Sequence, residues 1–280
     1  MQLIENGVFD EERAFYESKN VKVINCRFDG EADGESAFKE SEYIEAEQCF
    51  FNLRYPFWHD ENVRINDCEL TPLCRAALWY SRDIYISNTK MHGIKALREC
   101  EQVGLDSVDI ISSEFGWLSR NVKITNSSAE GEYFAFQVED LKMSNVEFKG
   151  KYSFQYLKNA RIENCKLDTK DAFWHAENVY VKNCIVNGEY LAWYSKNITF
   201  ENCIIRGTQP LCYCDGLRLI NCEMHDADLS FEKSNVEAEL TTPLISIKNP
   251  LSGRIVLPSV EELIIDNKNT ECRIICTDAR

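Results

Sequence analysis

The clearest pattern in the chain is an alternation of apolar and polar residues that returns every nineteen residues. The phrase Asn-Val-Lys-Ile-Thr-Asn at 121–126 recurs as Asn-Ala-Arg-Ile-Glu-Asn at 159–164 and as Asn-Val-Tyr-Val-Lys-Asn at 178–183. We call the first apolar residue of each phrase, such as Val122, position 0. Apolar residues stand at positions 0, +2 and +7, and an apolar segment follows at +12 to +15. Alternation with a period of two predicts strands, so we expect three short strands in each repeat.

The length of the repeat limits the fold. From Ile84 to Val236 every step is nineteen residues, whereas the earlier steps of 23 and 21 residues place insertions near 30–34 and near 72–75. Such a unit is too short for a propeller blade and has no helical segment. It fits one turn of a parallel β-helix, whose turns stack about 4.8 Å apart. We therefore expect an all-β solenoid of about ten coils over residues 20–240, with residues 1–20 as an N-terminal cap and residues 241–280 as irregular closing coils and a C-terminal cap.

Equal positions of successive turns become vertical neighbours in such a fold, and the charges at position −2 test this. They alternate in sign over nine repeats: Glu61, Arg82, Glu101, Arg120, Glu139, Lys158, Glu177, Lys196 and Asp215. Opposite charges on neighbouring strands stabilise their pairing, and like charges oppose it. The pattern therefore predicts both the stacking and its register.

Two further residue types recur at fixed positions. Asparagine dominates positions −1 and +4, where its amide can bond to the amide of the next turn. Cysteine dominates position +5, and most of the thirteen cysteines lie there. We expect the asparagines to form structural ladders and the cysteines to be buried, reduced thiols.

Composition narrows the possible partners. A formal net charge of −15 argues against a nucleic acid or an anionic membrane surface as partner. The first ten residues do not resemble a secretory signal, and no segment has the length and apolarity of a membrane span. We expect a cytoplasmic protein without cofactor or metal.

Three features of the chain are specific: the Asn-Val-x-Ile-x-Asn-Cys phrases, the segment Ala-Phe-Trp-His-Ala-Glu-Asn at 172–178, and the closing Ser-Ile-Lys-Asn-Pro-Leu-Ser-Gly at 246–253. In these features the chain resembles the bacterial proteins catalogued as domain of unknown function 3737. The resemblance implies a single-stranded, right-handed β-helix similar in shape to pectate lyases. It implies no activity and no catalytic residues.

The repeat does not place the residues that a catalytic site needs close to one another. His59 and His175 share position −4 but lie six coils apart, so they cannot act together. Glu163 and Glu201 at position +3 lie two coils apart, which suits an inverting glycosidase, but Lys182 lies between them. We interpret these acids as a salt ladder and name no catalytic residue.

Aromatic residues at two positions give the more specific hypothesis. Position −4 reads Tyr156, His175, Tyr194 and Tyr213, and position −5 includes Trp174 and Trp193. Because strand alternation sends neighbouring positions to opposite faces, we expect positions −5 and +12 to fill the core and position −4 to lie outside. The turn at Gln155 disagrees and is expected to slip, pointing Phe154 and Tyr156 inward. An exposed row of rings could bind sugar rings by stacking, with Glu177 and Lys196 as polar flanks.

Three functions remain open. The first is a non-catalytic binding or scaffold protein with an oligosaccharide or a protein partner on the aromatic wall. The second is a polysaccharide lyase or glycoside hydrolase of the β-helix type. The third is a purely structural solenoid that pairs with another protein.

Overall fold

A computed structural model describes residues 1–32, 34–266 and 270–278, and these residues divide into two compact units, Met1–Lys142 and Met143–Arg280. Among the described residues there are strands, turns and bends but no helix. No helix long and apolar enough to cross a membrane occurs in that part of the chain. Each unit is a parallel β-solenoid, and we describe the two separately.

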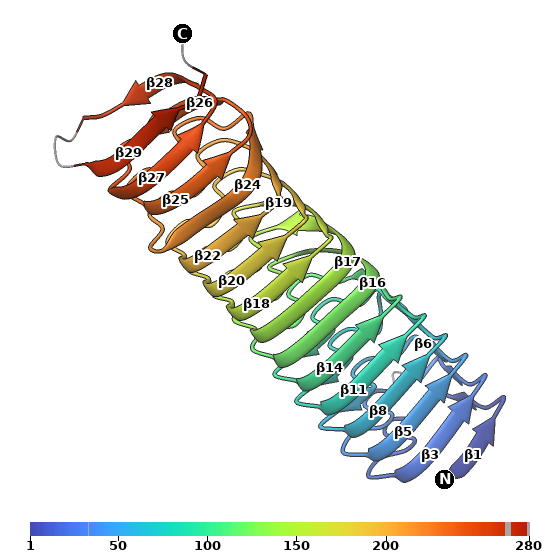
Figure 1. Ribbon diagram of the computed structural model, residues 1–280. Coiled ribbons are helices and arrows are strands. Elements are labelled where there is room, and N and C mark those ends of the chain that lie inside the picture. The colour runs from blue at the N-terminus through green and yellow to red at the C-terminus, as the bar shows by residue number, and fades with distance from the viewer. Residues whose placement is uncertain (33, 267–269, 279–280) are drawn as a thin grey trace. The chain divides into compact units, whose positions relative to one another are not determined.

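In the first unit, each turn opens with a strand that pairs in parallel with the equivalent strand of the next turn. These opening strands lie side by side in Figure 1. They are β1 (Gln2–Glu5), β3 (Lys19–Ile24), β5 (Glu42–Glu47), β8 (Glu61–Asn66), β11 (Arg82–Ser87), β14 (Glu101–Asp106) and β16 (Arg120–Glu132). A second row consists of β2 (Val8–Phe9), β4 (Arg27–Phe28), β6 (Phe50–Phe51), β9 (Glu69–Leu70), β12 (Lys90–Met91) and β15 (Asp109–Ile111). A third, shorter row consists of β7 (Phe57–Trp58), β10 (Leu78–Trp79) and β13 (Leu97–Arg98).

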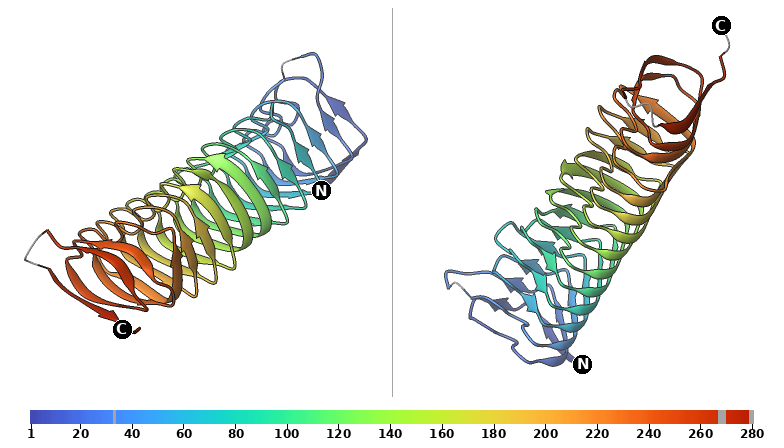
Figure 2. Two further views of the ribbon diagram at one scale, coloured as in Figure 1. Left: turned by 90° about the horizontal axis from the view of Figure 1, so that it is seen from above. Right: turned by 90° about the vertical axis from the view of Figure 1, so that its left-hand side faces the viewer.

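The second unit repeats this plan, and Figure 2 shows its strands stacked turn over turn. Its opening strands are β18 (Lys158–Glu163), β20 (Glu177–Lys182), β22 (Lys196–Glu201), β24 (Leu217–His225), β25 (Asn235–Leu240), β27 (Ser252–Leu257) and β29 (Glu271–Cys276). Between them run β19 (Lys166–Lys170), β21 (Ile185–Asn187), β23 (Ile204–Arg206), β26 (Leu244–Lys248) and β28 (Val260–Ile264). Strand β17 (Glu139–Lys151) contains residues of both units.

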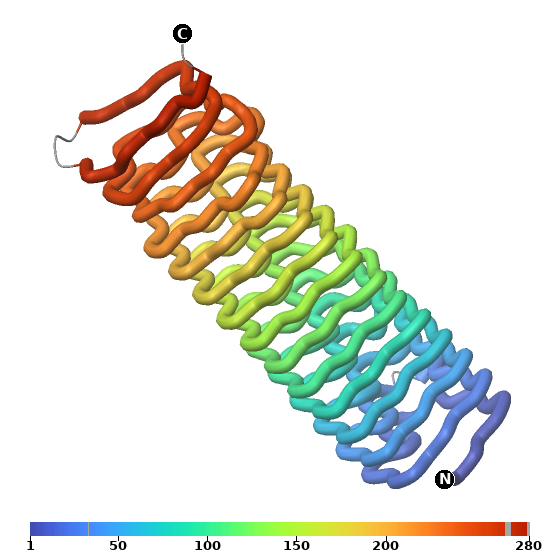
Figure 3. The backbone as a smooth tube through the Cα atoms, viewed as in Figure 1, coloured from blue at the N-terminus to red at the C-terminus, as the bar shows by residue number. Residues whose placement is uncertain are grey.

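The register follows the predicted numbering. Position 0 pairs with position 0, as in Ile84 with Val103 in the first unit and Val179 with Ile198 in the second. The turns outnumber the ten that we expected, because β1 already pairs with β3, and β25, β27 and β29 continue the pairing near the end of the chain. The chain trace in Figure 3 follows the successive turns of each unit.

The core of each unit consists of apolar columns at positions 0, +2, +5 and +7, which are buried in almost every turn. Phenylalanine rings stack within it, as between Phe28 and Phe51 at 4.7 Å and between Phe154 and Phe173 at 5.2 Å. Parallel stacking at this separation adds about 0.5–1.5 kcal/mol per pair to the burial of the rings. The columns therefore hold successive turns in one register.

Polar ladders run along the outside, as the sequence predicts. Asn183 donates from Nδ2 to Oδ1 of Asn164 at 3.2 Å, and Asn202 donates likewise to Asn183 at 3.3 Å. In the charge column, Arg82 lies 2.6 Å from Glu61, and Glu177 pairs in register with Lys196. These observations confirm the asparagine ladders and the register inferred from the charges.

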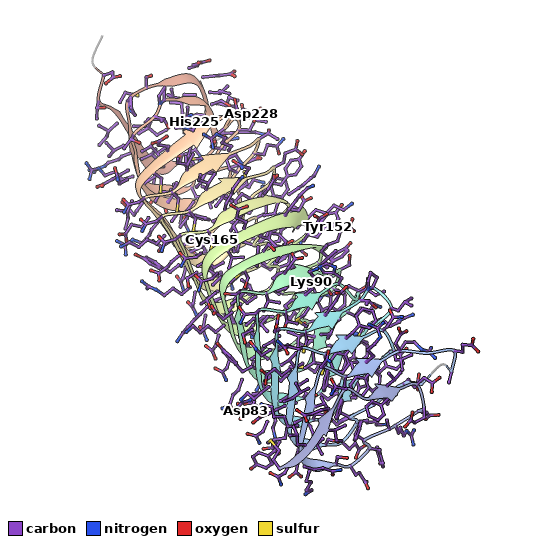
Figure 4. All side chains as sticks on the ribbon, turned by 90° about the vertical axis from the view of Figure 1, so that its right-hand side faces the viewer. Asp83, Lys90, Tyr152, Cys165, His225 and Asp228 are labelled. Carbon is purple, nitrogen blue, oxygen red and sulfur yellow. The ribbon has the colours of Figure 1, made fainter. Side chains whose placement is uncertain are left out.

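The cysteines at position +5 are buried, which confirms that part of the prediction. Cys165, labelled in Figure 4, donates its backbone N–H to Sγ of Cys184 in the next turn at 3.3 Å, and its own thiol donates to the carbonyl of Glu163 at 3.2 Å. The thiols thus contribute to the hydrogen bonding between turns. Their reduced state stays a prediction.

Candidate functional site

The candidate site lies on the second unit, in the segments that lead into β18, β20, β22 and the isolated bridge at Asp215. One turn shows how the backbone places the side chains. Phe173 and His175 have left-handed φ angles of 60° and 56°, whereas ordinary strands have negative φ throughout. Ala172, Phe173 and Ala176 are buried, while Trp174 is half-buried and His175 is exposed.

This local geometry corrects the prediction for position −5. Left-handed residues at −6 and −4 interrupt the alternation of a strand, so both −5 and −4 lie outside the core. Trp174 and Trp193 are half-buried rather than core residues, and position −6 fills the core instead. The expectation for position +12 holds at Phe115, Phe134, Ala172 and Leu191, which are buried.

Four rings at position −4 form a continuous stack, which we call the aromatic ladder: Tyr156, His175, Tyr194 and Tyr213. Successive ring centroids are 4.8, 5.1 and 4.9 Å apart, with planes within 12°, 10° and 13° of parallel. Tyr156 and Tyr194 remain 41% and 44% exposed, and Tyr213 is half-buried. Because the rings cover part of each other's faces, the inner rings present mainly their edges and polar tips to solvent.

A second ladder of position −5 side chains runs beside the first. Trp174 and Trp193 stack at 5.4 Å, and each indole Nε1 donates to a backbone carbonyl sixteen residues later, at 2.7 and 2.8 Å. Gln155 donates from Nε2 to the carbonyl of Asp171 at 3.0 Å, again sixteen residues on. Gln155 therefore takes the place of a tryptophan without any slip: Phe154 is buried as expected, but Tyr156 is exposed.

The two ladders contact each other edge to face. The ring centroids of Trp193 and Tyr213 are 5.5 Å apart, with an interplanar angle of 72°. Tyr190, which belongs to neither ladder, contacts Trp193 at 5.3 Å and 77°. Sequence reasoning missed Tyr190, although tyrosine recurs at its position, −8, in Tyr133 and Tyr152. The structure thus brings together all six aromatic residues named from the sequence.

Charged groups border the ladder. Glu177 and Lys196, the predicted flanks, begin β20 and β22 and pair in register. At Tyr213, burial and the nearby Glu232 carboxylate raise the pKa of the phenol, and the ammonium of Lys233 lies 5.8 Å from the ring centroid. The border therefore carries both signs of charge.

The acids considered for catalysis are engaged in ion pairs. Arg161 lies 2.6 Å from Glu163, and Lys182 lies 2.7 Å from Glu201, which also accepts a hydrogen bond from the Tyr180 hydroxyl. The Lys182 ammonium and the Tyr180 hydroxyl lower the pKa of Glu201. A carboxyl group held ionised in this way is poorly suited to act as a general acid.

The histidines are distributed as the sequence implies. His92 lies 2.8 Å from Asp109, and His225, labelled in Figure 4, lies 2.9 Å from Glu223. His59 stacks on Tyr80 at 4.9 Å in the first unit, and His175 belongs to the aromatic ladder of the second. Among the described residues, no group of three or more His, Cys, Asp or Glu is placed to hold a metal ion.

Comparison with solved structures finds β-helical proteins at very low sequence identity. The bacteriophage CBA120 tailspike protein 3 is 9% identical, with a TM-score of 0.44 over 94% of this chain and 57% of the tailspike. The A-module of the mannuronan C-5 epimerase AlgE4 from Azotobacter vinelandii is 8% identical, with a TM-score of 0.31 over 91% of this chain and 88% of the module. The catalytic domain of a GH87 α-1,3-glucanase is 9% identical, with a TM-score of 0.36 over 98% of this chain and 63% of the domain. The chain thus spans little more than half of the tailspike.

Sequence comparison gives one assignment. No curated protein matches the chain. The sequence model of one family covers residues 2–276, which is nearly the whole chain. The chain therefore belongs to the family described as protein of unknown function (DUF3737).

Proposed function

We propose that this protein is a non-catalytic binding protein whose second unit holds an extended carbohydrate chain on the aromatic ladder. The observation that supports the proposal is a stack of four rings, three exposed to solvent and Tyr213 half-buried, at a regular separation of 4.8 to 5.1 Å. This separation is close to the rise of one sugar unit in an extended glycan. One ring would then meet one sugar along the stack.

The chemistry of the exposed ring parts suits a sugar. Tyr156, Tyr194 and Tyr213 carry a phenolic hydroxyl that can donate and accept, and the His175 imidazole offers the same two functions. Apolar ring edges lie between these polar tips and match the C–H faces of a sugar. The contacts proposed are therefore hydrogen bonds to the tips and apolar contacts to the edges, in place of the full face stacking expected from the sequence.

A purely structural role is the main alternative, since stacked rings also stabilise the turns that carry them. The two roles differ in what a truncation changes. A structural ladder loses stability only, whereas a binding ladder also loses affinity for its ligand. One matched pair of variants can separate these effects.

The variants are Tyr194→Ala and, as control, Tyr80→Ala. Tyr80 is 41% exposed and stacks on His59 at 4.9 Å in the first unit. Its truncation therefore removes a stacked, partly exposed ring like that of Tyr194, but away from the aromatic ladder. A panel of neutral and uronic-acid oligosaccharides is titrated while the tryptophan fluorescence is recorded, because Trp193 contacts both Tyr194 and Tyr213. Thermal unfolding is measured on the same samples.

We expect at least one oligosaccharide to bind, and Tyr194→Ala to weaken it about tenfold or more, as for a central contact of an interface. Tyr80→Ala should leave that affinity unchanged while lowering the melting temperature to a similar extent. If no member of the panel binds, or if both variants bind as the wild type does, the ladder is structural and the proposal fails.

A further inference from the structure

The two insertions that break the nineteen-residue repeat lie together in the first unit and border one depression. Its volume is about 540 Å³, and its lining includes Glu31 from the first insertion and Pro72, Leu73 and Arg75 from the second. Leu53 and Ile94 complete its apolar side. We call this depression, defined by these six residues, the insertion pocket. Its lining residues belong to the first unit, whereas the aromatic ladder belongs to the second.

The apolar side of the insertion pocket is exposed to solvent, and the loop that carries Leu73 is anchored in the core. Leu73 is 63% exposed and Ile94 is 44% exposed, although both carry large aliphatic side chains. The loop is fixed beside them, because Cys74 is fully buried and its N–H donates to the carbonyl of Thr71 at 2.9 Å. Gly93 allows this approach: a Cβ there would lie 2.2 Å from the Cys74 carbonyl oxygen. The loop thus holds Leu73 in solvent, where an apolar ligand could cover it.

Most polar groups around the insertion pocket have partners within the protein. The Asn52 amide donates to Asp29 at 2.9 Å and accepts from Thr71, and Arg54 lies 3.4 Å from Glu35. Arg75 differs, because its exposed guanidinium has no hydrogen bond or ion pair with any of the described residues. The chain has a net charge of −15, so a positive charge without a protein partner beside exposed aliphatic side chains is unusual on its surface.

We propose that the insertion pocket binds a small monocarboxylate with an apolar body. The guanidinium of Arg75 donates two parallel hydrogen bonds to the carboxylate, a geometry that this side chain favours. The apolar body covers Leu73, Leu53 and Ile94. Glu31 also lines the pocket and repels anions, so it restricts the ligand to one carboxylate, placed on the side of Arg75.

Octanoate serves as the probe, with acetate as a carboxylate without the apolar body and octan-1-ol as an apolar body without the charge. Binding to the full chain is measured by isothermal titration calorimetry. We expect saturable binding of one octanoate and, for both comparison compounds, binding at least about tenfold weaker. Arg75→Gln should weaken the binding of octanoate by about 10- to 100-fold, which is the loss expected when a charge-assisted hydrogen bond is removed.

The matched control is Arg273→Gln, which removes the same charge from an exposed arginine of β29 in the second unit. It should leave octanoate affinity unchanged. A second variant, Leu73→Ser, should weaken the binding of octanoate because it removes an apolar contact while the charge of Arg75 is retained. This variant keeps the test decisive if Arg75→Gln does not fold. Absence of saturable octanoate binding, equal affinity in wild type and both pocket variants, or an equal loss with Arg273→Gln would each overturn the proposal.

Discussion

Asp60 is a carboxyl group buried in the first unit, and its removal should change how stability depends on pH. The residue is 1% exposed. Oδ1 accepts a hydrogen bond from the Ser41 N–H at 2.9 Å, whereas Oδ2 is buried without a hydrogen-bond partner among the described residues. Burial raises the pKa of Asp60 from 3.8 to about 9. The folded protein therefore keeps this carboxyl protonated at neutral pH.

The sign of the effect follows from this difference. The folded state binds the proton more tightly than the unfolded state, so the stabilising contribution is complete below pH 3.8 and is lost as the pH rises toward 9. At about 1.36 kcal/mol per pH unit, the loss between pH 3.8 and pH 7 amounts to about 4 kcal/mol. Asp60→Asn keeps an acceptor for Ser41 and has no titrating proton. We expect the variant to be more stable than the wild type at pH 7 by up to about this amount.

The assay compares urea unfolding of wild type and Asp60→Asn at pH 5, 7 and 8.5. Other titrating groups contribute equally to both proteins, so the difference in unfolding free energy isolates Asp60. We expect this difference to grow in favour of the variant with each increase in pH. A difference that does not change with pH, or that favours the wild type at pH 8.5, would refute the reasoning.

Three further predictions concern the fold. In native protein, a thiol reagent should label the exposed Cys276 rapidly and the buried Cys165 slowly, as mass spectrometry of the labelled peptides can show. Gln155→Leu should lower the unfolding free energy by about 1 kcal/mol, because it removes the hydrogen bond to Asp171, whereas Gln155→Trp should restore it. Gly188→Ala should cost more than about 2 kcal/mol in urea unfolding, since its Cβ would lie 1.9 Å from a backbone carbonyl oxygen at a φ of +149°.

The stacked fold was predictable because each turn repeats the same residue types at the same positions. The alternation of Glu61, Arg82 and Glu101 specifies which turns are neighbours, and the structure pairs these residues in that order. The apolar positions 0 and +2 specify which side faces the core. Regular strands obey such rules because their side chains alternate strictly.

The orientation of the aromatic positions was only partly predictable. The exposure of Tyr194 was expected, but Trp174 and Trp193 were assigned to the core by a rule that holds for strands alone. Left-handed residues such as Phe173 and His175 break that rule, and phenylalanine is not a residue type that signals a left-handed backbone. Gln155 departs from its column in lacking an aromatic ring, but it shares with Trp174 and Trp193 a side-chain N–H that donates to a carbonyl sixteen residues later.

The insertions show a similar limit. The irregular steps of 23 and 21 residues indicate where the repeat is broken. They do not indicate that the two loops border one depression, because that depends on the burial of Cys74 and on its close approach to Gly93. The same approach of a glycine to the preceding turn recurs at Gly131 and Gly188, so the glycine marks the repeat and does not show what the insertions border.

The most direct test of the aromatic ladder as a binding surface is a crystal structure of the full chain with the tightest-binding oligosaccharide of the panel. We predict that the glycan lies along Tyr156, His175, Tyr194 and Tyr213, with about one sugar per ring and its hydroxyls within hydrogen-bond distance of the ring tips. A glycan bound elsewhere on the protein, with the ladder free of ligand, would contradict the account.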